Sequence, residues 1–118
     1  MKRISTHILD VSVGKPARDV PVRLEKHEAH GGWRRLTDAR TDADGRCAQL
    51  LPAEELHAEE LASGNYRLVF DTASYFKASN VEGLYPVVEI TFHVREGESH
   101  FHIPLLLNAH GYTTYRGS

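Results

Sequence analysis

Apolar side chains recur at every second position along much of this chain, and this alternation limits the folds it can adopt. The clearest segments are residues 4–9, 20–25, 66–70, 88–94 and 101–106. A period of two is typical of strands with one buried face, because successive side chains point to opposite faces of a strand. Clusters of turn-forming residues separate these segments. The pattern predicts an all-β chain folded as a two-sheet β-sandwich of seven to eight strands.

Two stretches compete for one short helix in this otherwise β-rich chain. Residues 52–61 are rich in helix formers, with Pro52 near the start and Gly64 beyond the end. Residues 72–78 also fit a short turn of helix after a strand. The composition slightly favours the first stretch, and both stay open at this point.

The size, charge and cysteine content of the chain limit its number of domains, its partners and its compartment. Its 118 residues fit a single domain, residues 1–118. A net charge of −2 gives no electrostatic reason to expect nucleic acid or an anionic membrane as a partner. A single cysteine, Cys47, excludes an internal disulfide framework and fits a reducing compartment. No apolar run is long enough for a secretory signal or a membrane helix, so we expect a cytoplasmic protein.

Histidines lie on the outward faces of the first and last apolar strands. Ile4 and Ile8 take the core side of the first strand, so His7 points away from the core. Ile103 places His102 in the same way on the last strand. Taken alone, each fits a solvated strand histidine as well as a functional one. Both are candidates for acid–base chemistry, because the pKa of an imidazole is easily tuned near neutral pH.

The same outward faces also carry apolar residues. Leu9 on the first strand, and Pro104 and Leu106 on the last, would meet water in a monomer. A second subunit is the simplest cover for them, and the histidines would then line a cleft at an interface. Pro104 has no backbone N–H, which favours an edge or bulged position for it.

The end of the chain is rich in hydrogen-bonding groups. Residues 115–118 read Tyr-Arg-Gly-Ser and closely follow the apolar run 103–107. They carry a phenol, a guanidinium, a hydroxyl and the α-carboxylate, so we expect a tail that is tied down and used. Arg46, which follows a turn, suits an anionic or carbonyl-rich substrate because a guanidinium binds such oxygens in a fork.

Other chemistries lack their motifs in this sequence. His100 and His102 have the spacing of strand ligands, with His93 nearby, but no His-Glu-x-x-His or paired cysteines accompany them. A glycine-rich phosphate loop and a Gly-x-Ser-x-Gly nucleophile elbow are also absent from the sequence. We therefore predict no metal and no cofactor, and a metal-binding module built on the three histidines is the weakest alternative.

Three blocks of the sequence resemble one known family. They are residues 5–10 (Ser-Thr-His-Ile-Leu-Asp), 41–46 (Thr-Asp-Ala-Asp-Gly-Arg) and 112–118 (Tyr-Thr-Thr-Tyr-Arg-Gly-Ser). These look like the 5-hydroxyisourate hydrolases, the transthyretin-related proteins of purine degradation, and shorter matches extend the resemblance over essentially the whole chain. The resemblance implies a transthyretin-like domain with its main helix near residues 72–79. It also implies a homotetramer, a dimer of dimers, with active sites in a channel at the dimer–dimer interface.

The resemblance assigns roles to individual residues. The catalytic set would be His7, Arg46, His102 and Ser118, and the substrate-binding set would be His7, Arg46, Tyr115 and Arg116. The implied reaction is hydrolysis of the cyclic amide C–N bond of 5-hydroxyisourate to 2-oxo-4-hydroxy-4-carboxy-5-ureidoimidazoline. Either histidine could be the general base, and Ser118 could act through its hydroxyl or its carboxylate. Arg116 could instead hold the tail by an ion pair.

One departure and one alternative accompany this resemblance. Family members often carry Leu-Ser-Pro and an aromatic residue before the terminal motif, whereas residues 107–110 here read Leu-Asn-Ala-His. This difference concerns the loop that presents the tail and leaves the motif intact. The alternative function is a small-ligand carrier without catalysis, as in transthyretin, which lacks the terminal motif.

Overall fold

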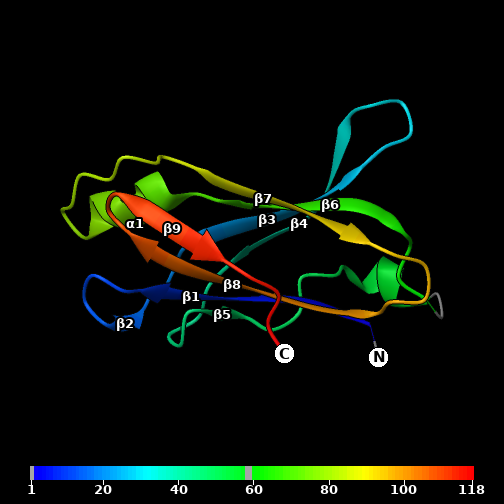
Figure 1. Ribbon diagram of the computed structural model, residues 1–118, viewed down its shortest axis with the longest axis horizontal. Coiled ribbons are helices and arrows are strands. Elements are labelled where there is room, and N and C mark those ends of the chain that lie inside the picture. The colour runs from blue at the N-terminus through cyan, green and yellow to red at the C-terminus, as the bar shows by residue number, and fades with distance from the viewer. Residues whose placement is uncertain (1, 58–59) are drawn as a thin grey trace.

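The computed structural model describes residues 2–57 and 60–118, which form two β-sheets with one α-helix and one short 3₁₀ helix (Figure 1). In chain order the elements are β1 (Arg3–Asp10), β2 (Lys15–Pro16), β3 (Pro21–His27), β4 (Trp33–Arg40), β5 (Arg46–Cys47), η1 (Ala53–His57), β6 (Gly64–Phe70), α1 (Thr72–Ala78), β7 (Val88–Val94), β8 (His100–Asn108) and β9 (Gly111–Thr114). Neither helix in the described part of the chain is long and apolar enough to cross a membrane.

The strands form the two layers of a sandwich. Sheet A has the order β2-β1-β8-β9, with β5 also paired to β1, and sheet B has the order β4-β3-β6-β7. The β-sandwich expected from the alternation is confirmed. The described residues form nine strands, and seven of these remain when the two-residue strands β2 and β5 are set aside, in agreement with the expected seven to eight.

The core lies between the inward faces of the two sheets. Ile4, Ile8 and Leu105 of sheet A are fully buried, as are Leu68 and Phe70 of sheet B. These are the apolar members of the alternating segments, so the pattern placed the core face correctly. Burying such side chains is the main favourable term in folding, about 1.5–3 kcal/mol each.

One pairing in sheet A joins distant parts of the chain. β1 and β8 are parallel over eight residue pairs, from Arg3 opposite His100 to Asp10 opposite Leu107. Because β1 lies near the beginning of the chain and β8 near its end, this pairing brings the two ends of the sequence into one sheet.

The helix occupies the second of the two candidate stretches. Asp71 caps α1, accepting hydrogen bonds from the backbone N–H (3.1 Å) and hydroxyl (2.6 Å) of Ser74. The expected helix near residues 72–79 is therefore confirmed. In the competing stretch, residues 53–57 form the 3₁₀ helix η1 rather than an α-helix, and residues 58–59 lie outside the described residues.

Pro104 lies within a central strand. β8 has β1 on one side and β9 on the other, so the expected edge position is wrong. The pairing with β9 ends at Leu105 opposite Thr114, and a single bridge between His102 and Gly117 follows in the same register. Pro104 lies in the gap between them, where its missing N–H leaves no bond unmade. Its carbonyl accepts a hydrogen bond from the Thr114 hydroxyl at 2.8 Å.

A buried hydrogen bond attaches α1 to the end of β1. The Tyr75 hydroxyl donates to Oδ2 of the buried Asp10 at 2.6 Å. Burial, with the neighbouring carboxylate, raises the pKa of Tyr75 to about 12, so the phenol stays protonated as the donor.

Replacing Tyr75→Phe should lower the free energy of unfolding by about 2 kcal/mol, because a bond to a buried carboxylate is lost. Urea unfolding measures the change. Tyr85→Phe is the matched control, because the Tyr85 hydroxyl has no hydrogen-bond partner among the described residues. Equal stabilities of the two variants would contradict the role of this bond.

Candidate functional site

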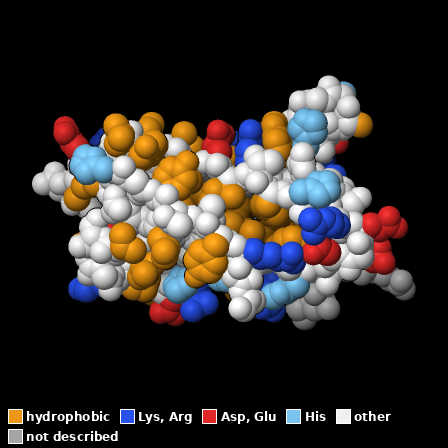
Figure 2. Space-filling view, in the orientation of Figure 1, with side chains coloured by type: hydrophobic (Ala, Val, Ile, Leu, Met, Phe, Trp, Pro, Cys, Tyr) orange, Lys and Arg blue, Asp and Glu red, His pale blue; other side chains and the backbone are white. Residues whose placement is uncertain are grey.

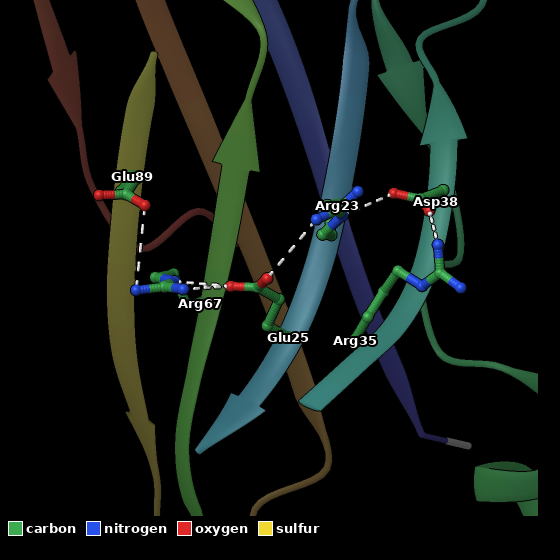
Figure 3. A network of polar contacts seen from close by, with 6 residues as sticks. All are labelled: Arg23, Glu25, Arg35, Asp38, Arg67 and Glu89. Carbon is green, nitrogen blue, oxygen red and sulfur yellow. Dashed lines mark hydrogen bonds and ion pairs between the residues drawn. The ribbon is translucent and has the colours of Figure 1, made fainter. Parts of the chain in front are cut away.

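The outer faces of the two sheets carry different chemistry. On sheet B, ion pairs run from strand to strand across the whole sheet (Figure 3). Their members are Arg35, Asp38, Arg23, Glu25, Arg67 and Glu89. The Arg23 guanidinium, which donates to Asp38 at 2.9 Å, holds the pKa of that carboxyl below its usual range. A face whose charges satisfy one another in this way is suited to contact with water.

A concavity of about 740 Å³ lies on this charged face. Its charged groups are already engaged, since Arg23 pairs with Asp38 and Arg40 with Asp19. This concavity is larger than the cavity on sheet A described below. Its two arginines are already paired, and its remaining carboxylate, Asp71, is engaged as the cap of α1.

Sheet A brings the predicted histidines and Arg46 to one outer face. His7 on β1 is the register partner of Arg46 on β5, and on its other side it pairs with Pro104 of β8. Ser5, two residues before His7, pairs with His102. Because residues two apart on a strand share a face, His7 and His102 lie diagonally across the β1–β8 pair, with Arg46 beside them.

Two neighbouring strands hold His102. On the β1 side, the Ser5 hydroxyl lies 2.9 Å from Nδ1 of the imidazole. On the tail side, the backbone N–H of Gly117 donates to the His102 carbonyl at 2.8 Å. A Cβ at position 117 would lie 2.5 Å from Cδ2 of the ring, so only glycine lets the tail approach this closely.

An open cavity of about 200 Å³ lies beside this histidine. Arg46, His102 and Ser118 line it, together with Ser5, Cys47 and His100 among others. Pockets that enclose a small ligand usually measure about 300–1,000 Å³. This cavity is thus smaller than a typical ligand pocket, with residues of three strands and the tail on its walls.

Three of the predicted residues are placed differently. His7 is outside the lining of this cavity but close enough for its charge to act on His102. Tyr115 is 56% exposed, and Tyr115 and Arg116 border a second cavity between β7 and β8. Arg116 donates to Glu98 (3.0 Å) and to the His100 carbonyl (3.1 Å), and its guanidinium lies over the Phe101 ring. These contacts fit the alternative in which Arg116 anchors the tail.

Ser5 and Cys47, which were not predicted as site residues, also line the cavity. Ser5 shares its strand face with His7, so the alternation contained a signal for it. Cys47 is buried, and burial raises the pKa of its thiol to about 11, which keeps it protonated and unsuited to nucleophilic attack.

His93, His100 and His102, the histidines of the alternative metal-binding module, do not lie together in the structure. His93 lies on β7 in sheet B, where its ring is bonded to Asn65 at 2.8 Å, whereas His100 and His102 lie on β8. Within residues 2–57 and 60–118, no group of three or more His, Cys, Asp or Glu side chains is placed to hold a metal ion.

The fold and the site together define a class of protein: a transthyretin-like sandwich with an imidazole- and guanidinium-lined cavity on one sheet. The family model described as HIUase/Transthyretin family matches residues 4–117. The 5-hydroxyisourate hydrolase of Caulobacter vibrioides is 43% identical over 123 aligned positions, covering all of both chains. The chain belongs to the HIUase/Transthyretin family.

Solved structures of both branches of the family are similar to this chain. The Klebsiella pneumoniae 5-hydroxyisourate hydrolase superposes with a TM-score of 0.82 at 37% identity, covering all of both chains. Sea bream transthyretin, solved in complex with thyroxine, gives a TM-score of 0.86 at 30% identity, covering 97% of this chain and 93% of the other. The backbone therefore does not separate an enzyme from a carrier, and the side chains must decide.

The electrostatic setting of His102 gives a testable pH dependence. Burial, followed by the charges of His7, Arg46 and His100, lowers the pKa of His102 below its ordinary value of 6.5. The unfolded chain then binds a proton at a higher pH than the native chain does. This histidine therefore costs no stability above about pH 6.5 and destabilises the fold increasingly as the pH falls towards its native pKa.

NMR titration should give a native His102 pKa below 6.5. Between about pH 7.5 and about pH 5, the wild type should lose more stability than His102→Gln, whose side chain does not titrate. A native pKa at or above the ordinary value would contradict this account.

Proposed function

We propose that this protein is a 5-hydroxyisourate hydrolase, which hydrolyses a cyclic amide C–N bond of its substrate to give 2-oxo-4-hydroxy-4-carboxy-5-ureidoimidazoline. The observation that carries the proposal is the convergence of His102, Arg46 and Ser118 on one cavity of sheet A. The names of the relatives from Caulobacter and Klebsiella support it.

In the proposed mechanism, His102 is the general base. Its lowered pKa keeps the imidazole neutral near pH 7, so a ring nitrogen can accept a proton from water. The resulting hydroxide adds to the amide carbonyl, the C–N bond breaks, and the imidazolium returns the proton to the departing nitrogen. His7, diagonally across the strand pair, is placed to hold or relay a proton on the same face.

Arg46 and the tail complete the proposed chemistry. The exposed Arg46 guanidinium stabilises the negative charge that develops on the carbonyl oxygen of the substrate. Ser118, which lines the cavity, orients the ring, and Arg116 holds the tail through Glu98. No side-chain nucleophile and no metal takes part in this scheme.

The homotetramer, a dimer of dimers, is part of the proposal. The edge strands β7 and β9 have no partner on their outer sides within the described chain. Beside them lies the second cavity, of about 330 Å³, whose apolar lining is Ile90, Phe92, Phe101 and Ile103, and Figure 2 shows apolar side chains gathered across this face. A second copy pairing along these edges would cover this apolar surface.

A second contact would complete the site. Leu9 and Leu106 are register partners and only partly buried on the outer face of sheet A. Packing two such faces together would cover them and add walls to the 200 Å³ cavity. The expected cytoplasmic location is also part of this proposal and stays a prediction.

The rival function is a carrier of a small aromatic ligand. The transthyretin structure with bound thyroxine shows that a similar fold can hold such a ligand. An apolar ligand would favour an apolar lining, whereas this cavity carries Arg46, His100 and His102. Among the superposed structures, the identity to the hydrolase, 37%, is higher than that to transthyretin, 30%, which points the same way.

A coupled ultraviolet assay tests the proposal. Urate oxidase generates 5-hydroxyisourate from urate, and its decay is followed with and without the chelator-treated protein. Faster decay with the protein supports a metal-independent hydrolase. Decay at the spontaneous rate, from a folded tetramer, would overturn the proposal in favour of the carrier.

His7→Ala and His102→Ala should each lower kcat by about 10²-fold or more, because proton transfer loses its acceptor or relay. Sedimentation should show both variants as tetramers. His30→Ala, an exposed histidine in the turn between β3 and β4, is the matched control and should keep the wild-type rate. Full activity of both site variants would make the histidine assignment wrong.

Deleting residues 115–118 should abolish turnover and leave the unfolding free energy little changed, because the Arg116–Glu98 pair is largely exposed. Gly117→Ala should act in the same direction, since the new methyl group collides with the His102 ring. Normal activity in the truncated protein would contradict the role of the tail.

A further inference from the structure

The Ser5 side chain contacts the imidazole of His102, the proposed general base. Ser5 and His102 are register partners on the outer face of the β1–β8 pair. The Ser5 hydroxyl lies 2.9 Å from Nδ1 of His102 and has no other hydrogen-bond partner among the described residues. Ser5 is 8% exposed and His102 is half-buried, so the contact is partly shielded from water on the wall of the cavity.

This contact gives the two nitrogens of the imidazole different surroundings. Nδ1 faces the protein and is occupied by the hydroxyl, which leaves Nε2 for water and substrate. A neutral imidazole carries its proton on one nitrogen and a lone pair on the other. For Nε2 to act as a base, the proton must be on Nδ1, where the Ser5 oxygen can accept it.

We propose that Ser5 is a positioning residue that holds His102 in the Nδ1–H tautomer and so presents Nε2 as the proton acceptor. This inference rests on the proposed function for its catalytic consequence, but the tautomer is a property of the free protein. When Nε2 takes a proton, the Nδ1–H bond to Ser5 becomes charge-assisted and therefore stronger. Ser5 thus also stabilises the imidazolium that forms during the reaction.

The groups around His102 disfavour its protonated form, so a hydrogen-bond acceptor at Nδ1 matters for stabilising the imidazolium. The groups that act on His102 are His7 on β1, Arg46 on β5 and His100 on its own strand, and each of them disfavours a positive ring. Arg3 of β1 also borders the cavity. The Ser5 oxygen offers a protonated His102 a hydrogen-bond acceptor within this set of cationic and titratable groups.

The neighbouring hydroxyl on the same strand supplies a matched control. The Thr6 hydroxyl also bridges β1 to β8, donating to the Ile103 carbonyl at 2.6 Å, but it is buried on the inner face. Thr6→Val removes a bridging hydroxyl without touching His102. It should lower stability and leave the tautomer of His102 and the pH profile unchanged.

The first experiment is activity-independent. Nitrogen-15 NMR of the free protein, with His102 assigned through His102→Gln, reports which ring nitrogen carries the proton. The wild type should show the Nδ1–H form, and Ser5→Ala should show a mixture of tautomers and a lower His102 pKa. A wild type in the Nε2–H form, or a Ser5→Ala protein with unchanged tautomer and pKa, would overturn the inference.

The second experiment measures turnover. Ser5→Ala should lower kcat by about tenfold with KM nearly unchanged, and the acid limb of the pH profile should move with the His102 pKa. Ser5→Thr, which keeps the hydroxyl, should restore most of the rate. Wild-type kcat in Ser5→Ala would overturn the inference, whereas an inactive wild type with the expected tautomer shift would refute only the proposed function.

Discussion

The parallel pairing of β1 with β8 is the constraint on which the site depends. Eight register pairs hold residues about a hundred positions apart at neighbouring places in one sheet. The pairing sets Ser5 opposite His102 and His7 opposite Pro104, and β5 adds Arg46 at the next position across. A slip of β1 by one residue would turn Ser5 and His7 towards the core and expose Ile4 and Ile8, so the buried residues that fix the register also fix the position of the site residues.

The outer faces of the two sheets differ in how their charged side chains are paired. Ion pairs across sheet B satisfy its charges internally and suit it to water. Sheet A instead combines partly exposed leucines with imidazoles and with the Arg46 guanidinium, which makes no ion pair with the described residues. Exposing the apolar part of such a face to water is unfavourable, and this is the physical reason why the proposed subunit contact and the proposed catalytic site share it.

The tail acts through backbone geometry as much as through its side chains. Gly117 continues the register of β9 past the gap at Pro104 and contacts the His102 ring where no larger residue fits. Pro104 has no N–H to donate to the tail, and Gly117 has no Cβ to collide with Pro104 or His102, so the tail can lie close to β8. The tail and the Ser5 hydroxyl together fix the position of one imidazole from both sides.

The alternation of apolar residues predicted the β-sandwich, the buried face of each long strand and the outward direction of His7 and His102, because a period of two depends on local backbone geometry. The chemistry of Arg46 and of the tail made both candidates, and the resemblance of the sequence blocks added their roles. The tertiary fold established which stretch became the α-helix, that Pro104 lies in a central strand and that Arg116 pairs with Glu98. It also decided that Ser5 meets His102, because strand order and register are set by packing between segments far apart in the chain, which no local pattern encodes.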